Sequence, residues 1–415
     1  MQFTCQVLFI VEKSLKFCNP RWLVITMAKP VLWPRCDQET WSLTPPNRYV
    51  INGEYSDKFS NDQIEEVSDL KGSAYYKPFL GLLNLNNAKI LVERHRSRGI
   101  GDLLFLSGPI SYLYHLSGGT AKFYLKSLVD RGTILYNHPA LHLKTPLYGP
   151  TLYDTLPLYD YHWFIESVTE FNEDQEQPNV YDVLYRQLGF DPKSIDPVYK
   201  RPSVGFDESD ARGLHSFYQA IWSEKQIDLR SEPYYVVAPF SHGVIRTASY
   251  TMWLNLIQEL SKKHPVAIIG SLRHELPDTD MSAGEFVQRL RSMGQQSPKI
   301  INLISDIPLR SVLGIISKSR CVFSLDSAPL YMAQACRVPA ISIWGPHSPH
   351  VRIGYDKAYM DLAIHEKSAC PNSPCYAYSG FPKTKCPELE GQKICSVLAN
   401  VNVSSIMEKL SLVEL

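Results

Sequence analysis

The feature that most constrains the fold is a regular alternation of strand and helix patterns between residues 234 and 345. Continuous apolar runs of strand length occur at 234–240, 266–271, 299–304, 321–325 and 340–345. Helical patterns lie between them at 247–263, 283–293, 308–318 and 328–336. Because strands that alternate with helices at this spacing form parallel sheets covered on both faces, the sequence predicts an α/β fold.

A second strand, loop and helix unit precedes this series. Residues 88–119 begin with a β-branched run, turn at Gly99 and Gly101, and continue as an apolar helical pattern to Gly118 and Gly119. Shorter elements are expected after it: strands at 121–125 and 133–137, helices at 159–171 and 181–191, and a polar linker at 205–213. Two α/β domains facing each other across a cleft are therefore predicted.

The predicted organisation has four parts. Residues 1–85 form an irregular N-terminal extension, 86–212 an N-terminal Rossmann-like domain, 213–398 a C-terminal Rossmann-like domain, and 399–415 a helix that packs back on the N-terminal domain. A chain of 415 residues is long enough for each domain to bury its own core.

Composition narrows the partners and the compartment. Lys plus Arg equals Asp plus Glu, 42 against 42, so overall charge does not recruit nucleic acid or an anionic membrane. Apolar runs fall short of the roughly 20 residues of a membrane span. Nine cysteines, an odd number, favour a reducing compartment. We expect a cytoplasmic protein. Charges at Glu12, Lys13 and Lys16 argue against a secretion signal, and Met27 is an alternative start.

The stretch FSLDSAP, residues 323–329, places Asp326 and Ser327 between a buried strand and a helix. In parallel sheets ligands bind at this end of the strands, and the free N–H groups of a helix start attract anions. The N–H groups of Ser327, Ala328 and Leu330 are candidates for a phosphate, whereas Pro329 has none. The alternative is an ordinary helix cap.

The loop PFSHGVIRTAS, residues 239–249, also follows a strand and precedes a helix. Ser241, Gly243 and Arg246 would offer a hydroxyl, a close backbone approach and a forked cation to a diphosphate. A solvated polar loop is the alternative. Two such loops in one sheet favour the phosphate site. We expect the donor nucleoside beside it, at Gly270, Ser271 and Ser305.

The loop RHRSRGIGD, residues 94–102, places Asp102 at a helix start across the predicted cleft. A carboxylate there could take the proton of an acceptor hydroxyl, or could simply cap the helix. The basic run of this loop could contact an anionic acceptor or form a solvated rim. The predicted acceptor-side residues are Arg96, Arg98, Gly99 and Gly101.

Four late cysteines, Cys370, Cys375, Cys386 and Cys395, lie close together in the sequence. Thiolates bind structural zinc, but their spacing differs from tight C-x2-C knuckles. Zinc, disulfides and free buried thiols all remain open.

Three segments together resemble the ADP-heptose:lipopolysaccharide heptosyltransferases. RSRGIGDLLFLSGPISYL is similar to their R-x-x-G-D segment, APFSHGVIRTAS to their strand-to-phosphate loop, and SLDSAPLYMAQACRVPAISIWGP to their D-S/T-G-P-x-H-x-A-x-A-x-x-x-P segment. The resemblance covers roughly residues 88–410, and the third segment is its most specific part.

The resemblance implies a GT-B fold and an inverting glycosyltransferase. A nucleotide-diphosphate sugar would bind the C-terminal domain and a hydroxyl acceptor, a glycan or lipopolysaccharide, the N-terminal one. Matched residue by residue, Asp102 would be the general base and Arg246 the phosphate-binding cation, with the donor loop formed by Asp326, Ser327 and Ala328. No metal would be required for catalysis, because a helix start and a cation stabilise the leaving diphosphate.

This sequence departs from the pattern at two positions. Ala328 stands where the pattern has glycine, and Tyr331 where it has histidine; both are still expected to bind the donor. The tyrosine replaces a ring that can carry charge with a neutral phenol, so the expected donor sugar differs most at this point.

Other functions are compatible with the same residues. The acceptor could be a protein or a hydroxymethylated DNA base, although neutral charge favours a glycan over DNA. A sugar-nucleotide-binding or epimerase-like protein would use Asp102 only as a cap. A non-catalytic scaffold is a further alternative, for which Tyr331 is the only indication.

Overall fold

The computed structural model defines two parallel sheets and the helices around them. It describes residues 50–51, 54–55, 85–94, 99–127, 131–143, 160–165, 178–241, 244–271, 277–304, 307–375, 386 and 394–414. The predicted N-terminal extension lies almost wholly outside the described residues, apart from an antiparallel pair of strands, β1 (Val50–Ile51) and β2 (Glu54–Tyr55).

The larger sheet has six parallel strands in the order β11-β10-β9-β6-β7-β8. Its strands are β6 (Tyr235–Ala238), β7 (Val266–Gly270), β8 (Ile300–Ile304), β9 (Cys321–Leu325), β10 (Ala340–Ile343) and β11 (Ala363–Ile364). All five strands predicted between residues 234 and 345 are present. They could be identified because most of them are buried on both faces, which makes their sequences largely apolar.

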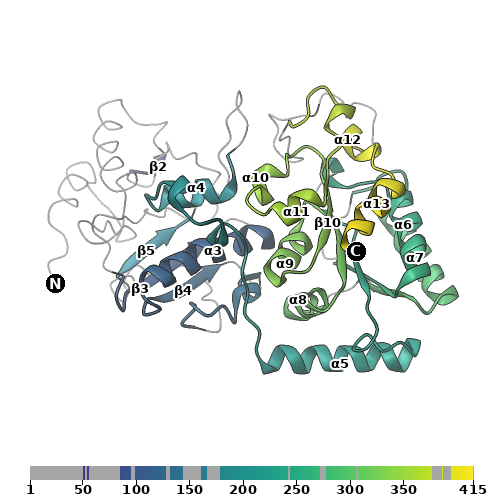
Figure 1. Cartoon of the computed structure of the whole chain (residues 1–415), viewed down its shortest axis with the longest axis horizontal. Helices are drawn as coiled ribbons and strands as arrows, with labels where there is room; N and C mark the ends of the chain where they lie inside the picture. Colours follow the sequence, from purple (N-terminus) through teal and green to yellow (C-terminus); the bar gives the residue numbers. More distant parts are fainter. Residues whose placement is uncertain are drawn as a thin grey trace.

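Helices cover both faces of this sheet (Figure 1). One face carries α5 (Glu208–Lys225), α8 (Leu309–Ser317) and α9 (Ala328–Cys336), and the other carries α6 (Tyr250–Lys263), α7 (Ala283–Gln296), α12 (Ser396–Ala399) and α13 (Val403–Glu414). Two short helices, α10 (His350–Ile353) and α11 (Lys357–Asp361), follow β10. We call this sheet and its helices the C-terminal lobe.

The last helix does not lie where the sequence suggested. We expected residues 399–415 to pack on the N-terminal domain, but α13 packs against α6 and β10. Ile406 and Leu410 are buried in that core, and Lys263 of α6 lies 2.7 Å from Glu414. The apolar face of α13 therefore packs against the C-terminal lobe itself and not against the N-terminal domain.

The smaller sheet has three parallel strands in the order β4-β3-β5, with β3 (Lys89–Arg94), β4 (Lys122–Ser127) and β5 (Tyr161–Phe164). Helix α3 (Ile100–Leu116) packs on it, followed in the chain by the 3-10 turn η3 (Arg131–Leu135) and α4 (Val180–Gln187). We call this part the N-terminal lobe.

Three predictions for the connecting elements were wrong. Residues 133–137 were expected as a strand and lie largely in η3, whereas residues 159–171 were expected as a helix and contain β5. The predicted linker 205–213 contains the start of α5, because Asp207 and Asp210 form a capping box there.

One hydrophobic core joins the two lobes. It runs from Val92 and Leu103 of the smaller sheet and its helix, through Phe105 and Tyr331, to Val322 of the larger sheet. The rings of Phe105 and Tyr331 meet edge to face with centroids 4.5 Å apart. The lobes are therefore packed together.

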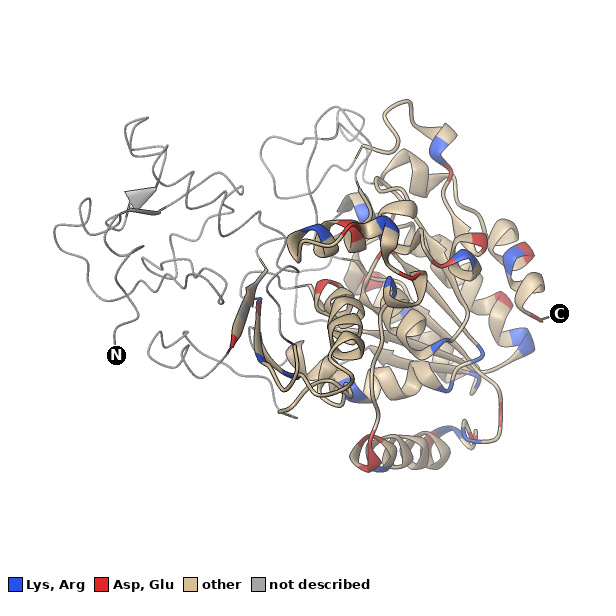
Figure 2. Cartoon of the chain, turned by 60° about the vertical axis from the view of Figure 1, so that its left-hand side comes forward, with Lys and Arg blue, Asp and Glu red and all other residues tan. Residues whose placement is uncertain are grey.

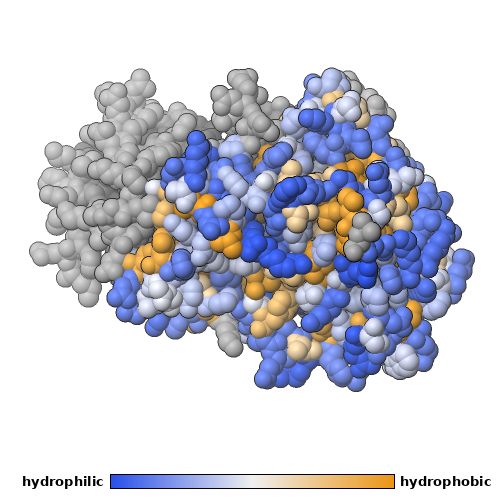
Figure 3. Space-filling model, viewed as in Figure 1, coloured by the Kyte–Doolittle hydropathy of each residue, from blue (hydrophilic) through white to orange (hydrophobic). Residues whose placement is uncertain are grey.

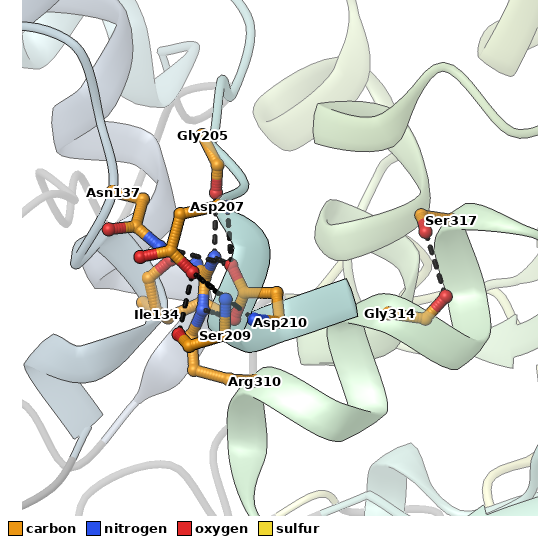
Figure 4. Close-up of polar contacts among 9 residues, drawn as sticks. All are labelled: Ile134, Asn137, Gly205, Asp207, Ser209, Asp210, Arg310, Gly314 and Ser317. Atoms are coloured by element: carbon orange, nitrogen blue, oxygen red, sulfur yellow. Dashed lines mark hydrogen bonds and ion pairs between the residues drawn. The ribbon is translucent and has the colours of Figure 1, made fainter. Parts of the chain in front are cut away.

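Arg310 of α8 links the lobes through polar contacts (Figure 4). Its guanidinium forms an ion pair with Asp210 and donates hydrogen bonds to the carbonyl oxygens of Ile134, at 3.1 Å, and Gly205, at 2.7 Å. Asn137 donates a further hydrogen bond to Asp210 at 3.0 Å. The planar guanidinium thus holds η3 and the start of α5 against α8.

A second polar contact lies between α4 and the segment between α10 and α11. Tyr355 donates a 2.6 Å hydrogen bond to Asp182, and the Lys200 ammonium lies 3.5 Å from the same carboxylate. Lys200 also sits 3.7 Å from the centre of the Tyr355 ring. The lobes are therefore tied at two separate places.

The surface of the described residues is mixed in character. Basic and acidic residues are interspersed along the ribbon (Figure 2), and hydrophilic residues cover most of the described surface in the view of Figure 3. Among the described residues, no helix is long and apolar enough to cross a membrane.

Replacing Arg310 with Gln should destabilise the protein by about 3 to 5 kcal/mol, because it leaves the Asp210 carboxylate buried without its cation. Urea unfolding of full-length protein at pH 7 would measure this. Arg212→Gln is the matched control. Arg212 pairs with Glu208, and their side chains are 73% and 95% exposed, so this variant should lose no more than about 0.5 kcal/mol of unfolding free energy.

The Arg310 effect should also depend on pH. Burial alone would raise the pKa of Asp210, but hydrogen bonds from Arg310 and the Asp207 backbone hold it below its ordinary value of 3.8. This stabilisation is present above that value and is lost as the pH falls below it. The difference in unfolding free energy between wild type and Arg310→Gln should therefore become smaller below about pH 3.8. If Arg310→Gln and Arg212→Gln lose equal stability at pH 7, the role of Arg310 is contradicted.

Candidate functional site

The predicted donor residues gather at one edge of the larger sheet. Strands β6 and β9 are hydrogen-bonded neighbours with Ala238 opposite Ser324, so the loops that follow them leave the sheet side by side. One loop carries Ser241 and Arg246, and the other carries Asp326 and Ser327. Parallel strands end at the same edge, and the sequence prediction of a shared site rested on this geometry.

Asp326 is a buried carboxylate with three partners. It accepts hydrogen bonds from the Tyr331 hydroxyl and from Nδ1 of His347, the latter at 3.0 Å, and Arg246 Nη1 lies 4.0 Å away. Burial would raise the pKa of Asp326, but the hydrogen bond from His347 and the charges of Arg246 and Arg352 lower it well below its ordinary value. Asp326 is therefore ionised, and as an anion it is suited to hold Arg246 rather than to bind phosphate directly.

His347 was not among the residues identified from the sequence. It follows β10, the strand next to β9 in the sheet, and its side chain is 2% exposed. The segment IWGPHSP was interpreted only as a strand ending in a glycine turn. The signal that could have found it was its place at the carboxyl end of a strand adjacent to the Asp326 strand.

The start of α9 has the features of an anion site. No side chain caps it, because the Ser327 hydroxyl lies 3.1 Å from the Ser324 hydroxyl instead. The N–H of Leu330 donates to the Ser327 carbonyl at 3.1 Å, so the proposed contribution of Leu330 is wrong. The first-turn N–H groups, at Ala328 in particular, are left as the candidates for an anion.

The loop after β6 offers a hydroxyl beside this helix start. The Ser241 Oγ atom is buried and has no hydrogen-bond partner among the described residues. A buried polar atom of this kind is costly unless a ligand or water satisfies it. The Arg246 side chain is 22% exposed, and Gly243 lies outside the described residues.

The other helix start at this edge is already filled. Both Tyr250 and Thr251, the first residues of α6, donate their N–H groups to the Asp280 carboxylate, at 2.8 and 3.2 Å. Burial raises the pKa of Asp280, but hydrogen bonds from Thr251, Thr279 and Ser249 lower it to about 2. A bound anion would meet this carboxylate at α6, so the start of α9 is the better anion site.

The predicted nucleoside residues are only partly described. Gly270 ends β7 next to the donor loop, and a Cβ atom there would lie 2.4 Å from Phe240 Cδ2. Ser271 is exposed at the same edge, and Ser305 lies outside the described residues. Their contact with a nucleoside stays a prediction.

Asp102 lies in the first turn of α3, on the N-terminal lobe. Gly99 is the N-cap, so Asp102 is at the third helical position and the alternative that it is the cap is wrong. Its carboxylate pairs with Arg94 Nη2 at 3.3 Å and is a quarter exposed, and Arg94 also donates to the Ile165 carbonyl at 3.0 Å. A buried arginine thus orients a carboxylate that solvent can reach.

The first turn of α3 touches the donor edge directly. A Cβ atom on Gly101 would lie 2.8 Å from Cδ2 of Tyr331, so the absence of a side chain lets the tyrosine ring approach the helix. Tyr331 in turn bonds to Asp326. The contact places the start of α3, which carries Asp102, next to the residues that hold Arg246.

The structure says less about the other predicted acceptor-side residues. Gly99 is exposed at the start of α3, whereas Arg96 and Arg98 lie outside the described residues.

Within the described residues, no group of three or more His, Cys, Asp or Glu side chains is placed to hold a metal ion. Burial raises the pKa of Cys395, and Cys375 and Cys386 raise it further; in the part of the chain that the structure describes, none of Cys370, Cys375, Cys386 and Cys395 is in a disulfide. Structural zinc at these four cysteines stays a prediction.

Comparison with known proteins gives one family match. Residues 193–378 match the model of glycosyltransferase family 9 (heptosyltransferase). No curated protein matches the chain.

Several solved structures share the fold. The ADP-heptose lps heptosyltransferase II of E. coli has a TM-score of 0.51 and 12% identity, covering 78% of this chain and 98% of its own. A family 9 glycosyl transferase from Veillonella parvula DSM 2008 has a TM-score of 0.51 and 10% identity, covering 80% and 98%. The iron-containing dodecameric glycosyltransferase TibC from enterotoxigenic E. coli H10407 has a TM-score of 0.52 and 14% identity, covering 80% and 77%.

These findings confirm the resemblance and the fold drawn from the sequence. The chain has the GT-B fold, and its residues 193–378 carry the glycosyltransferase family 9 match. The predicted enzyme class, a glycosyltransferase, is confirmed.

Proposed function

We propose, from the family 9 match and the geometry of the site, that this glycosyltransferase moves a sugar from a nucleotide-diphosphate sugar to a hydroxyl acceptor with inversion. The observation that carries the proposal is the contact between Gly101 and Tyr331. It supports a site in which a solvent-accessible carboxylate of one lobe stands beside the cation and helix start of the other. Asp102 would face the acceptor, and Arg246 with α9 would face the donor.

The proposed reaction is a single displacement. The acceptor oxygen attacks the anomeric carbon from the side opposite the diphosphate and forms the new C–O bond. The bond to the diphosphate oxygen breaks, and the diphosphate leaves with the electron pair. Asp102 takes the proton of the acceptor hydroxyl. Arg246 and the N–H groups at the start of α9 stabilise the charge that develops on the leaving group.

An ADP-sugar is the first donor to test, because the structural neighbour TibC has been solved in complex with ADP-D-beta-D-heptose. For the acceptor we propose a glycan or a lipopolysaccharide-like molecule. Lys plus Arg equals Asp plus Glu, 42 against 42, and this balance favours a glycan over DNA.

Arg246→Ala should weaken binding of ADP or another nucleotide diphosphate by about 1.5 to 3 kcal/mol, or roughly 10- to 150-fold, because a charge-assisted contact to phosphate is lost. Calorimetry on the full chain measures this. Arg289→Ala, at a 56% exposed arginine on α7, is the control and should bind like wild type. Unchanged affinity in Arg246→Ala would remove Arg246 from the donor site.

Turnover should survive EDTA, since we propose that Arg246 and α9 stabilise the leaving group without a metal. The measurement compares initial rates with EDTA and with magnesium. A rapid loss of turnover that magnesium restores would refute the metal-free mechanism. A slow loss accompanied by unfolding would instead indicate structural metal at the late cysteines.

Asp102→Asn should lower turnover with the true acceptor by at least about a hundredfold, since a general base contributes about 10² to 10⁴ in rate. Donor affinity should hold, because the donor loops lie on the other lobe. Stability should fall by up to about 3 kcal/mol, because the Asn carbonyl can still accept from Arg94 but no longer neutralises its buried guanidinium, so turnover is compared on variant protein shown to be folded.

Asp160→Asn is the matched control for Asp102. Asp160 lies at the opposite end of the same sheet, where it accepts a 2.9 Å hydrogen bond from the Lys89 N–H. Its turnover should equal that of wild type. Near-normal turnover in Asp102→Asn would place the base elsewhere, with His95, which lies outside the described residues, as the next candidate.

A further inference from the structure

The contacts of Asp326 point to a role for two residues beside the proposed donor site. Tyr331 comes from α9, His347 from the loop after β10, and Arg246 from the 3-10 turn η7 (Val244–Arg246) after β6. All three converge on one carboxylate. Side chains from three segments of the chain thus fix its position.

The three side chains contact both oxygens of the Asp326 carboxylate. Tyr331 donates to Oδ1, whereas His347 Nδ1, at 3.0 Å, and Arg246 Nη1, at 4.0 Å, both approach Oδ2. The Asp326 and His347 side chains are 6% and 2% exposed, so water contributes little to holding the carboxylate. Its direction, and the ion pair with Arg246, therefore depend on the Tyr331 and His347 hydrogen bonds.

The charge states fit this arrangement. Burial lowers the pKa of His347, and Arg352 and Arg246 lower it further, against the opposing effect of Asp326. His365 lies within electrostatic range of the same imidazole. A neutral imidazole with its proton on Nδ1 donates to the ionised Asp326 and adds no positive charge that would compete with Arg246.

We propose that His347 and Tyr331 are positioning residues that fix Asp326, and through it hold Arg246 in the orientation that binds the donor diphosphate. This rests on the proposed function. The pattern that this chain resembles has a histidine at position 331. In this chain a tyrosine hydroxyl at 331 and an imidazole from a neighbouring loop hold the carboxylate together.

The test measures ADP affinity by calorimetry for full-length wild type and variants. His347→Ala should weaken binding about 5- to 20-fold, the scale of coupling between contacting residues. His347→Asn should recover affinity to within about threefold of wild type, because its amide N–H can replace Nδ1. His347→Gln should not, because its amide group reaches toward the Nε2 position instead.

Tyr331→Phe tests the hydroxyl alone. It removes the donor to Asp326 and keeps the ring that packs against Gly101 and Phe105, so affinity should fall about 3- to 10-fold without loss of the lobe contact. The control is His365→Gln, at a nearby histidine whose Nε2 bonds to the Gly345 carbonyl and not to Asp326; the Gln amide can keep that bond, so this variant should bind ADP like wild type.

A double-mutant cycle separates positioning from general destabilisation. If His347 acts through Arg246, then His347→Ala should have almost no further effect on ADP affinity in an Arg246→Ala background. A purely structural effect would weaken binding equally in both backgrounds. Equal losses, or wild-type affinity in His347→Ala, would overturn the positioning role and leave the proposed function intact.

Other outcomes are also decisive. Failure of the wild type to bind any nucleotide diphosphate would overturn the proposed function, and the positioning role with it. Should His347→Ala fail to fold, the comparison of His347→Asn with His347→Gln decides, and equal affinities of these two folded variants would refute the proposal.

Discussion

The packing of Tyr331 against the first turn of α3 is the contact on which the site depends. It needs Gly101, because a side chain there would collide with the tyrosine ring, and it is supported by Phe105 one turn further along the helix. The two sheets thereby share one core. Arg310 and the Lys200–Asp182 pair hold the lobes at other points, so their relative position is fixed by both apolar and polar contacts.

This packing links electrostatics on the two lobes. Asp102 is paired with a buried arginine on one side, and Asp326 is paired with Arg246 on the other. Each of the two proposed functional side chains, Asp102 and Arg246, is therefore held by a buried group of opposite charge. Buried ion pairs of this kind contribute little net stability, but removing one partner leaves an uncompensated charge. Separating either pair, Asp102 from Arg94 or Arg246 from Asp326, would leave a buried charge unpaired, and this penalty keeps the site in one arrangement.

The sequence predicted the larger sheet better than the smaller one for a physical reason. Strands of the C-terminal lobe are buried on both faces and form apolar runs, whereas β5 begins at an aromatic and polar stretch whose pairing with β3 is decided by tertiary contacts. The 205–213 segment was interpreted as a linker because it is polar. The same polar residues, Asp207 and Asp210, start α5 as a capping box.

The same distinction applies to the site. Residues directly after strands, such as Asp326 and Arg246, could be identified because the ends of parallel strands share one edge. His347 obeys that rule too, since β10 lies beside β9, but its contact with Asp326 depends on how a proline-flanked turn folds back. The family match covers residues 193–378 and leaves out Asp102, so its proposed role as the base rests on the resemblance of residues 96–113 and on the geometry. The sequence could not show which charged side chains pair with each other. In the structure Asp326 pairs with Arg246 and bonds to His347, so Arg246 is the residue that would touch the donor, and Asp326 and His347 are the residues that would hold it in place.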